Sequence, residues 1–423
     1  MLMVRMIRAP QGTAGKLVTI ICALSVVAAT GCASVAGSKG VSANPANGAS
    51  SLNASTHTAT TNLLSGTQHT QVGGSTNGTQ SPQPPLQSVQ MITAKIGWAT
   101  SMQGGVLRTT DGGANWSDVT PPGLPTITIA TARALVPLGV TVARLVATDN
   151  GHLTVYSTST GGARWSQLTS PTLPRTSSWP QVYASFPSTE DGWILATSSP
   201  GLGLMATALV HTTDGGQSWT QVGAGTLPQS GMYETGITFN AAGDGVISGT
   251  YHGSSLTPLS VTANGGVTWR AETLPMPTGA TYLNTYPPAF WGESGLLPAE
   301  TGSTHDLVFY RTANGGQDWQ PLAVPLPGNG ASYFIWSMLS PTETFATNGF
   351  VVYQTADGGH SVTVKTNTDL QDAWSMDFLT ATEGWVIVKG ELLRTTNGGI
   401  TWTPAAQGEQ LPPVGSSTTP SGS

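Results

Sequence analysis

The stretch TTDGGANW at residues 109–116 decides the fold, because close variants of it recur through the rest of the chain. The other copies are TSTGGARW at 158–165, TTDGGQSW at 212–219, TANGGVTW at 262–269, TANGGQDW at 312–319, TADGGHSV at 355–362 and TTNGGITW at 395–402. Successive copies start 40–54 residues apart. Repeats of about 40–50 residues are typical of propeller blades. Seven copies therefore predict seven blades.

Two further motifs flank each copy. An apolar residue is followed six positions later by Gly-Trp or a variant, as in Met91 before Gly97-Trp98 and Phe378 before Gly384-Trp385. A Leu-Pro pair, first seen at Leu124-Pro125, follows most copies. Proline cannot continue a central strand, so we expect this pair to end the last strand of each blade.

Each repeat unit predicts four short antiparallel strands. In the last unit we expect strands at 373–379, 384–388, 392–396 and 401–404, with the Asn-Gly-Gly turn joining the third strand to the fourth. Asp-Gly and Asn-Gly favour hairpin turns because these residues tolerate positive φ. The predicted fold class is all-β, a seven-bladed β-propeller of four-stranded antiparallel blades over residues 86–412.

The phrase T-x-[DN]-x-G-x-x-W resembles the Asp box, or BNR repeat, of sialidase-like propellers. With Gly-Trp before it, the unit most resembles the extracytoplasmic propellers related to the photosystem II stability and assembly factor. The resemblance covers residues 86 to about 412 and departs at Thr160, where Asp is expected, and at Val362, where Trp is expected. It implies a propeller that acts outside the cytoplasm, as an assembly factor or as a glycan-acting enzyme.

The composition excludes several classes of protein. Charged residues make up 9% of the chain, whereas an ordinary soluble domain has about 25%. Long solvated helices would need more charged residues on their outer faces. Lys and Arg number 15 against 21 Asp and Glu, so the chain has no excess positive charge for binding phosphates. We therefore expect no nucleic-acid partner.

The N-terminus predicts an export signal at residues 1–31. A basic start is followed by an apolar run at 17–30, which is shorter than the roughly 20 residues that a membrane helix needs. The sequence Ala29-Thr30-Gly31-Cys32 resembles a bacterial lipobox, which implies cleavage before Cys32 and lipid attachment to its thiol. An ordinary cleaved signal is the alternative. Because Cys22 would leave with the signal, the mature chain could form no internal disulfide.

Residues 32–85 are rich in Ser, Thr, Gly and Asn and have few large apolar side chains. Such a segment cannot bury enough surface to offset the entropy of ordering it, so we expect a disordered tether. Residues 413–423 have a similar composition and are expected to be a flexible tail. Together with the export signal, this organisation predicts a monomer held outside the bacterial cell membrane by a lipid anchor.

The Asp or Asn that recurs in the repeat has two interpretations. It either binds calcium or another ligand, or it forms a structural turn. Asn replaces Asp in three copies, which a calcium site would tolerate poorly and a turn tolerates well. We therefore predict structural roles, with no metal and no cofactor. The turn residues are Asp111, Asp214, Asn264, Asn314, Asp357 and Asn397. The tryptophans expected to pack in the core are Trp116, Trp165, Trp219, Trp269, Trp319 and Trp402.

Sialidase chemistry is one catalytic hypothesis. The resemblance implies three arginines from separate blades that grip a carboxylate. Arg108, Arg311 and Arg394 share one repeat position, and Arg164 and Arg270 lie beside the repeat tryptophan. The remaining arginines of the predicted propeller are Arg133, Arg144 and Arg175, which all belong to the second blade and its exit. The sialidase triad therefore cannot be carried over to this chain.

A carboxylate pair is the other catalytic hypothesis, since most glycosidases use two acids about 5–10 Å apart. The acids expected at the end of the ring opposite the repeat turns are Asp149, Glu234, Glu300, Asp306 and Asp377. Glu300 and Asp306 share one long loop, but no spacing singles out a pair. We predict no catalytic residue, and a glycoside hydrolase remains the alternative function.

A binding surface is the main functional prediction. Long loops at 198–208, 251–258 and 298–306 are expected at one end of the ring, where aromatic side chains suit contacts with sugars or proteins. The candidate ligand face comprises Trp179, Tyr233, Tyr251, Tyr282, Tyr286, Glu300 and Asp306. Ordinary loop decoration is the alternative. We predict a non-catalytic scaffold for an envelope protein or glycan, with an assembly role among its possible uses.

Overall fold

The computed structural model describes most of the predicted propeller. The described residues are the backbone of 20–22 and residues 84–125, 132–149, 151–174, 179–198, 206–223, 232–250, 258–302, 304–322, 324–331, 333–366 and 370–406. Cys32, the tail at 413–423 and nearly all of the predicted signal and tether lie outside them. Nowhere in the described residues is there a helix long and apolar enough to cross a membrane.

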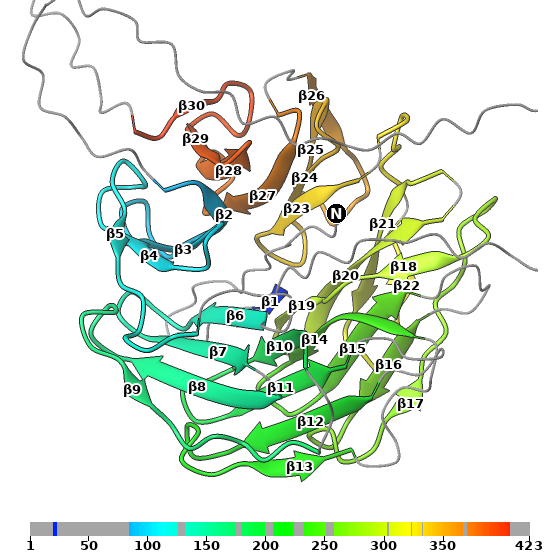
Figure 1. The fold of residues 1–423 in the computed structure, drawn as a ribbon. Helices are drawn as coiled ribbons and strands as arrows, with labels where there is room; N and C mark the ends of the chain where they lie inside the picture. Colours follow the sequence, from blue (N-terminus) through cyan, green and yellow to red (C-terminus); the bar gives the residue numbers. More distant parts are fainter. Residues whose placement is uncertain are drawn as a thin grey trace, which may run out of the picture. The chain divides into compact units, whose positions relative to one another are not determined.

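Seven antiparallel sheets form a ring, which confirms the predicted seven-bladed propeller (Figure 1). Blade 1 contains β2 (Leu86–Met91), β3 (Gly97–Ser101), β4 (Val106–Thr109) and β5 (Ser117–Asp118). Blade 2 contains β6 (Ala132–Pro137), β7 (Ala143–Asp149), β8 (His152–Thr158) and β9 (Ser166–Gln167). Blade 3 contains β10 (Gln181–Ser185), β11 (Gly192–Thr197), β12 (Thr207–Thr212) and β13 (Thr220–Val222), and the backbone of β1 (Ile20–Cys22) pairs with β10.

The remaining four blades follow in chain order. Blade 4 contains β14 (Tyr233–Phe239), β15 (Gly245–Thr250), β16 (Leu259–Thr262) and β17 (Arg270–Ala271). Blade 5 contains β18 (Leu283–Thr285) and β19 (Ala289–Trp291), which both pair with β20 (Ser294–Thr301), then β21 (Leu307–Thr312) and β22 (Gln320–Pro321). Blade 6 contains β23 (Ile335–Met338), β24 (Thr344–Thr347), β25 (Val351–Thr355) and β26 (Thr363–Thr366). Blade 7 contains β27 (Ala373–Phe378), β28 (Gly384–Val388), β29 (Glu391–Thr395) and β30 (Thr403–Pro404).

The strands of blade 7 lie within two residues of the predicted bounds at each end.

The role predicted for the Leu-Pro pair is wrong. β5 ends at Asp118 and β22 at Pro321, several residues before Leu124-Pro125 and Leu326-Pro327, so the pair belongs to the connection between blades. The carbonyl of Pro327 accepts a hydrogen bond from the Tyr353 hydroxyl at 2.9 Å, and that bond ties the connection to blade 6.

Each repeat turn is closed by its own side chains. The Thr109 hydroxyl accepts from the Gly113 N–H at 2.9 Å and donates to Asp111 Oδ1 at 2.8 Å. Asp111 Oδ1 also accepts from the Asn115 N–H at 2.9 Å. The φ angles of Gly112 and Gly113 are 80° and 94°, which L side chains rarely adopt. The spacing of the motif is thus the hydrogen-bond pattern of one turn.

The same turn is built where the sequence departs from Asp. Asn314 Oδ1 accepts from the Asp318 N–H at 3.0 Å, and Thr160 Oγ1 accepts from the Arg164 N–H at 2.9 Å. Where Asp is present, as in Asp214, hydrogen bonds from Ser218 hold the pKa of the carboxyl well below its usual range. A side-chain oxygen at this position is therefore sufficient, whether or not it is charged.

Stacked aromatic rings join blade 4 to blade 3 and blade 7 to blade 6. Phe239 lies opposite Gly245 in the sheet, and a Cβ on Gly245 would lie 2.4 Å from the Phe239 ring. The Phe239 ring stacks on Trp193 of blade 3 at 3.9 Å between centroids and meets Trp269 of its own blade edge-on at 5.8 Å. The six-residue step between the apolar residue and Gly-Trp therefore places a ring over a glycine at the blade interface.

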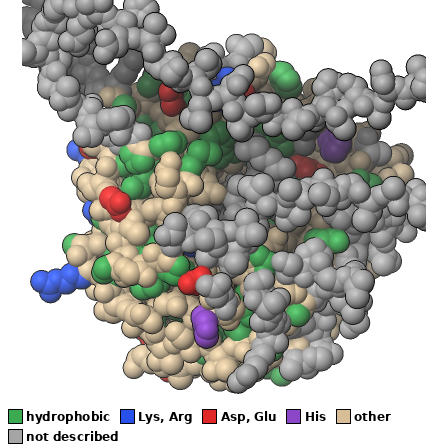
Figure 2. Space-filling model, viewed as in Figure 1, with side chains coloured by type: hydrophobic (Ala, Val, Ile, Leu, Met, Phe, Trp, Pro, Cys, Tyr) green, Lys and Arg blue, Asp and Glu red, His purple; other side chains and the backbone are tan. Residues whose placement is uncertain are grey.

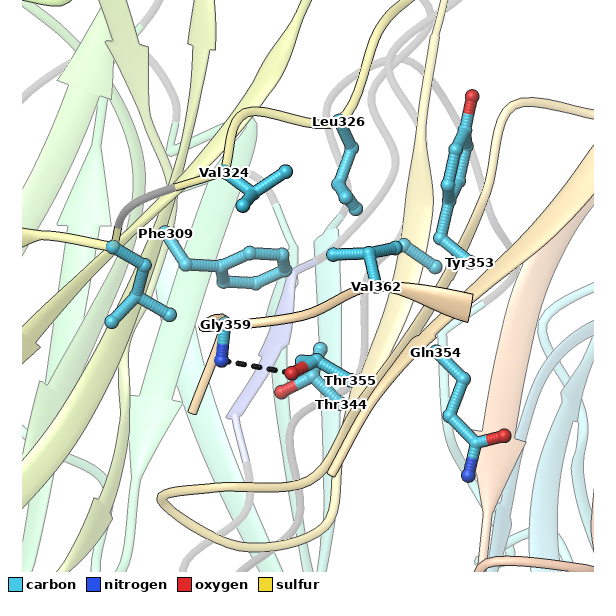
Figure 3. Close-up of a pocket in the computed structure, with 11 residues that line it drawn as sticks. Phe309, Val324, Leu326, Thr344, Tyr353, Gln354, Thr355, Gly359 and Val362 are labelled. Carbon is cyan, nitrogen blue, oxygen red and sulfur yellow. Dashed lines mark hydrogen bonds between the residues drawn. The ribbon is translucent and has the colours of Figure 1, made fainter. Parts of the chain in front are cut away.

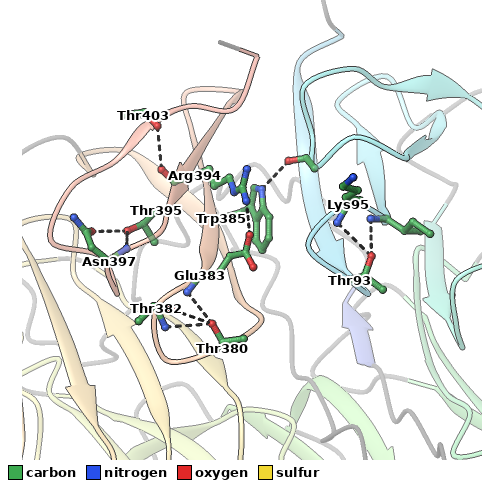
Figure 4. A network of polar contacts seen from close by, with 12 residues as sticks. Thr93, Lys95, Thr380, Thr382, Glu383, Trp385, Arg394, Thr395, Asn397 and Thr403 are labelled. Atoms are coloured by element: carbon green, nitrogen blue, oxygen red, sulfur yellow. Dashed lines mark hydrogen bonds and ion pairs between the residues drawn. The ribbon is translucent and has the colours of Figure 1, made fainter. Parts of the chain in front are cut away.

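The ring closes by blade packing, because the four blade strands of each sheet come from one continuous segment, with β1 added only to blade 3, and β2 and β27 lie side by side. The Met91 N–H donates to Asp377 Oδ2 at 2.6 Å. The Phe378 N–H donates to Ser337 Oγ at 2.8 Å at the equivalent position between blades 6 and 7. Trp385 Nε1 of blade 7 donates to the Gly112 carbonyl of blade 1 at 2.9 Å (Figure 4). The ends of the propeller thus meet through contacts that other blade pairs also make.

Blade 6 has Val362 where other repeats have Trp, and a cavity of about 10 Å³ lies at this point between blades 5 and 6 (Figure 3). Phe309 and Leu322 of blade 5 and Tyr353 of blade 6 line it with Val362. In the next blade, the equivalent Trp402 ring packs edge-on against Phe378. The smaller side chain leaves part of this interface unfilled.

We expect Val362→Trp to raise the melting temperature by a few degrees. Val362 is only partly buried, so the indole ring can extend beyond the small cavity and cover the apolar side chains that line it, as Trp402 covers Phe378 in the next blade. Differential scanning calorimetry of the purified chain would measure it. Val267→Trp is the matched control, since Val267 is 57% exposed in the repeat turn of blade 4. An unchanged or lower melting temperature for Val362→Trp alone would show that the cavity cannot admit the ring.

We expect Trp385→Phe to destabilise the propeller more than Trp319→Phe does, by about 1 kcal/mol, the net value of one hydrogen bond. Both substitutions remove the same atoms from a buried tryptophan. Trp385 Nε1 donates to blade 1, whereas Trp319 Nε1 has no hydrogen-bond partner among the described residues. Chemical denaturation would compare the two. Equal losses would mean that the bond to Gly112 does not stabilise ring closure.

Candidate binding face

The two ends of the ring carry different connections. The turns between the first two strands of each blade and the repeat turns emerge at one end, which we call the turn face. The connections between the second and third strands, and those between blades, emerge at the other end, which we call the loop face. This division follows from the antiparallel order of the strands in every blade.

Side chains of the turn face hydrogen-bond to one another (Figure 4). Thr380 Oγ1 accepts from the Glu383 N–H at 3.0 Å, and the Glu383 carboxylate pairs with Arg394. The Arg394 guanidinium lies 5.5 Å from the centre of the Trp385 ring. These charges stabilise turns and stacked rings in the blade.

The arginines are likewise engaged within the fold. Arg108 lies over the Trp98 ring at 5.7 Å, and Arg133 donates to the carbonyls of Gly104 and Pro125. Arg144 is 7% exposed and donates to Ser157 Oγ at 2.7 Å, and burial lowers its pKa. Arg175 lies outside the described residues.

The two candidate acids predicted to share one long loop, Glu300 and Asp306, have separate partners. Glu300 is 6% exposed; its Oε2 accepts from the Tyr286 hydroxyl at 2.8 Å and its Oε1 from the Phe334 N–H at 3.2 Å. Asp306 Oδ1 accepts from the Gly328 N–H at 2.9 Å and its Oδ2 from Thr304 Oγ1 at 2.6 Å. Glu300 joins blades 5 and 6, and Asp306 holds a loop to the connection that follows blade 5.

Two of the other candidate acids lie on the inner strands. Asp377 is 2% exposed and accepts the Met91 N–H described above. Glu234 is 4% exposed, and its Oε2 has no hydrogen-bond partner among the described residues. Burial raises the pKa of Glu234 to about 7. A carboxyl group in this position is neutral in mildly acidic solution.

The aromatic residues of the candidate ligand face differ in how far they are buried. Trp179 is 1% exposed and packs in the core between blades 2 and 3, so its expected place on the loop surface is wrong. Tyr286 is partly buried against Trp336, with 5.2 Å between ring centroids. Tyr282 covers Gly302, where a Cβ would lie 1.9 Å from the ring. Tyr233 is half-buried, and Tyr251 lies outside the described residues.

Two open pockets lie on the loop face at blades 1, 6 and 7, which carry none of the residues of the candidate ligand face. The pocket beside blade 1 measures about 490 Å³ and is lined by groups that include Trp116, Asp118 and Arg133. The second pocket lies between blades 6 and 7 and measures about 230 Å³. Its lining includes Tyr333, Asn348, Phe350, Gln371 and Asp372. An aromatic residue in the short turn Asn348-Gly349-Phe350 was the signal that could have pointed to it.

The described surface has few charges. Figure 2 shows isolated acidic and basic side chains among hydrophobic and uncharged polar ones. The described residues include no group of three or more His, Cys, Asp or Glu side chains that could hold a metal ion. Contacts at this surface would therefore depend on aromatic, amide and hydroxyl groups more than on ion pairs.

No family model and no curated protein matches the sequence. Solved structures match the fold. YCF48 bound to D1 peptide is 18% identical with a TM-score of 0.50, over 74% of this chain and 92% of that one. The GH74 xyloglucanase from Xanthomonas campestris is 12% identical with a TM-score of 0.48, over 76% and 53%. The Hadza microbial sialidase Hz136 is 13% identical with a TM-score of 0.38, over 68% and 66%. At these identities the likeness shows the propeller fold alone.

The buried Glu234 predicts that stability falls as pH rises. Its pKa is about 7 in the folded chain against 4.5 for an unperturbed group, so between these values the unfolded chain ionises and the folded chain does not. We expect a loss on the order of 3 kcal/mol from about pH 4.5 to pH 7, at 1.36 kcal/mol per pKa unit. The loss should be absent in Glu234→Gln.

Chemical denaturation at several pH values would measure this effect as the difference between the two proteins. Glu391→Gln is the matched control, because Glu391 is exposed on β29. If Glu234→Gln and the unsubstituted chain lose stability in parallel, the carboxyl of Glu234 is not neutral in the fold.

Proposed function

We propose that this chain is a non-catalytic propeller that binds a protein or glycan of the cell envelope at its loop face. One observation carries the proposal: each pocket described on that face has a single carboxylate in its lining, Asp118 in one and Asp372 in the other. Hydrolysis of a glycosidic bond by the usual mechanism needs two carboxylates on opposite sides of that bond.

The hydrogen bonds of Glu300 and Asp306, the two candidate acids predicted to share one loop, support the same conclusion. Glu300 accepts two hydrogen bonds between blades, and Asp306 accepts two within the loop and its neighbouring connection. An acid that already accepts hydrogen bonds from a backbone N–H and a hydroxyl is positioned for structure. The loop face instead offers open pockets with aromatic and amide groups, which suit reversible contact.

A peptide ligand is compatible with this architecture. The YCF48 structure, which shares the fold, is of that protein bound to a D1 peptide. We further propose that the chain acts outside the cytoplasmic membrane as a monomer, with the lipid anchor at Cys32 and the tether at 32–85 holding the propeller away from the bilayer. The support for this location is the lipobox-like sequence and the composition of the segment that follows it.

We expect the immobilised full chain to retain one component of an envelope or exopolysaccharide fraction without releasing sugars from it, as followed by mass spectrometry. Met102→Arg and Phe350→Arg on the loop face should each reduce retention at least about tenfold, a loss of about 1.4 kcal/mol. Val267→Arg and Ile400→Arg on the turn face are matched controls, because all four side chains are exposed by about half.

Released sugars that disappear in Asp118→Asn or Asp372→Asn would identify a hydrolase instead. Retention that is equally strong in the loop-face and turn-face variants would show that the loop face is not the binding surface.

A further inference from the structure

We propose that the pocket between blades 6 and 7 binds a neutral carbohydrate, with the flat face of a sugar ring against Phe350. The inference rests on the proposed binding role of the loop face and gives it a ligand class and a position. The turn that joins the second and third strands of blade 6 forms one side of the pocket, and the connection into blade 7 forms another.

The pocket is held in shape by one buried amide. Asn348 is 2% exposed; its Nδ2 donates to the Gly328 carbonyl at 3.2 Å, and its Oδ1 accepts from the Phe350 N–H at 3.1 Å. Oδ1 also accepts from the Val351 N–H at 3.2 Å. These bonds fasten the turn of blade 6 to the connection that follows blade 5. The backbone that carries Phe350 is therefore set before any ligand arrives, which lowers the entropy cost of binding.

The turn also requires glycine at its centre. Gly349 has a φ of 89°, and a Cβ there would lie 3.2 Å from the Tyr333 hydroxyl. Tyr333 thus packs directly under the turn, and burial raises its pKa, so its hydroxyl stays protonated at neutral pH. The close approach of Gly349 and Tyr333 forms one wall of the pocket.

Phe350 is an exposed aromatic ring beside polar groups. Its side chain is 47% exposed and belongs to the pocket lining. Covering such a ring removes apolar surface from water. One face of a sugar ring is made of C–H groups, while its rim consists of hydroxyls that need hydrogen-bond partners. A ligand of this kind matches an aromatic ring that is surrounded by amide, hydroxyl and carboxylate groups.

The polar groups of the pocket can both donate and accept hydrogen bonds. The amide of Gln371 does both, the carboxylate of Asp372 accepts, and the hydroxyl of Tyr333 does either. Sugar hydroxyls also donate and accept, so they can pair with each of these groups. An apolar ligand would displace water from these groups without offering hydrogen bonds in its place.

The charge of the site favours an uncharged ligand. Asp372 lies 3.6 Å from Lys389, and the two side chains are 68% and 71% exposed. Such a pair contributes little to stability, but its opposite charges offset each other at the pocket. An acidic sugar would be repelled by Asp372, which lines the pocket, and a basic sugar would gain little there because Lys389 already lies beside the same carboxylate. The volume of about 230 Å³ is below the roughly 300–1,000 Å³ of sites for drug-sized ligands, so one or two sugar rings fill it.

The test uses the full chain and four neutral tetrasaccharides as probes: cellotetraose, xylotetraose, maltotetraose and tetra-N-acetylchitotetraose. Saturation-transfer NMR and titration at millimolar sugar would measure binding. We expect at least one probe to bind, Phe350→Ala to weaken it at least about tenfold, and Gln371→Ala to weaken it several-fold. Phe350→Trp should restore or strengthen binding, because the larger ring offers more apolar surface.

Ile400→Ala is the matched control, since Ile400 is 58% exposed on the turn face and its loss should not change binding. Thermal unfolding of each variant would show that the propeller is folded. The inference is overturned if none of the four probes binds, or if binding survives Phe350→Ala. Binding of a tetragalacturonate or a peptide in place of the neutral sugars would also overturn it. The proposed function has its own readout, the loss of retention in the loop-face Arg variants, and would stand in those cases.

Discussion

Among the described residues, a Met or Phe side chain in five of the seven blades packs over the glycine at the start of the second strand, and the rest of this propeller depends on this packing at the boundary between blades. At Gly245 a side chain would occupy the space of the Phe239 ring, and that ring stacks on Trp193 of the blade before. A four-stranded sheet that is apolar on both faces cannot bury them alone. Each blade is therefore stable only between two others, and the ring must close.

Closure explains why several buried polar groups are structural. Asp377 accepts a backbone hydrogen bond from blade 1 at a position where the equivalent blade pair uses Ser337. Glu300 serves blades 5 and 6 in a similar way through Tyr286 and Phe334. Acids that would be catalytic candidates by position along the chain thus become part of the contacts between neighbouring blades. The two pockets described on the loop face each have one carboxylate among their described lining residues.

The same architecture leaves the loop face free to vary. The repeat turns satisfy their own hydrogen bonds, and buried side chains of the strands and connections fill the interfaces between blades, so the exposed residues of the connections at the other end can change with little effect on the fold. Binding residues are commonly found on loops that a rigid scaffold positions. The turn at Asn348-Gly349-Phe350 is such a loop: its buried amide belongs to the scaffold, and its aromatic ring faces outward.

The amino-acid sequence by itself determined the number of blades, the four strands of each and the structure of the repeat turns. The repeat turn depends on residues within four positions of one another, such as Thr109, Asp111 and Gly113, and the strands and blades follow from the recurrence of this turn along the chain. The tertiary structure alone decided how the ring closes, that Trp179 is buried, that Glu300 and Asp306 have separate partners, and that a pocket forms between blades 6 and 7. Each of these joins residues from different blades or connections, and a repeat pattern carries no information about which side chains meet across such a boundary.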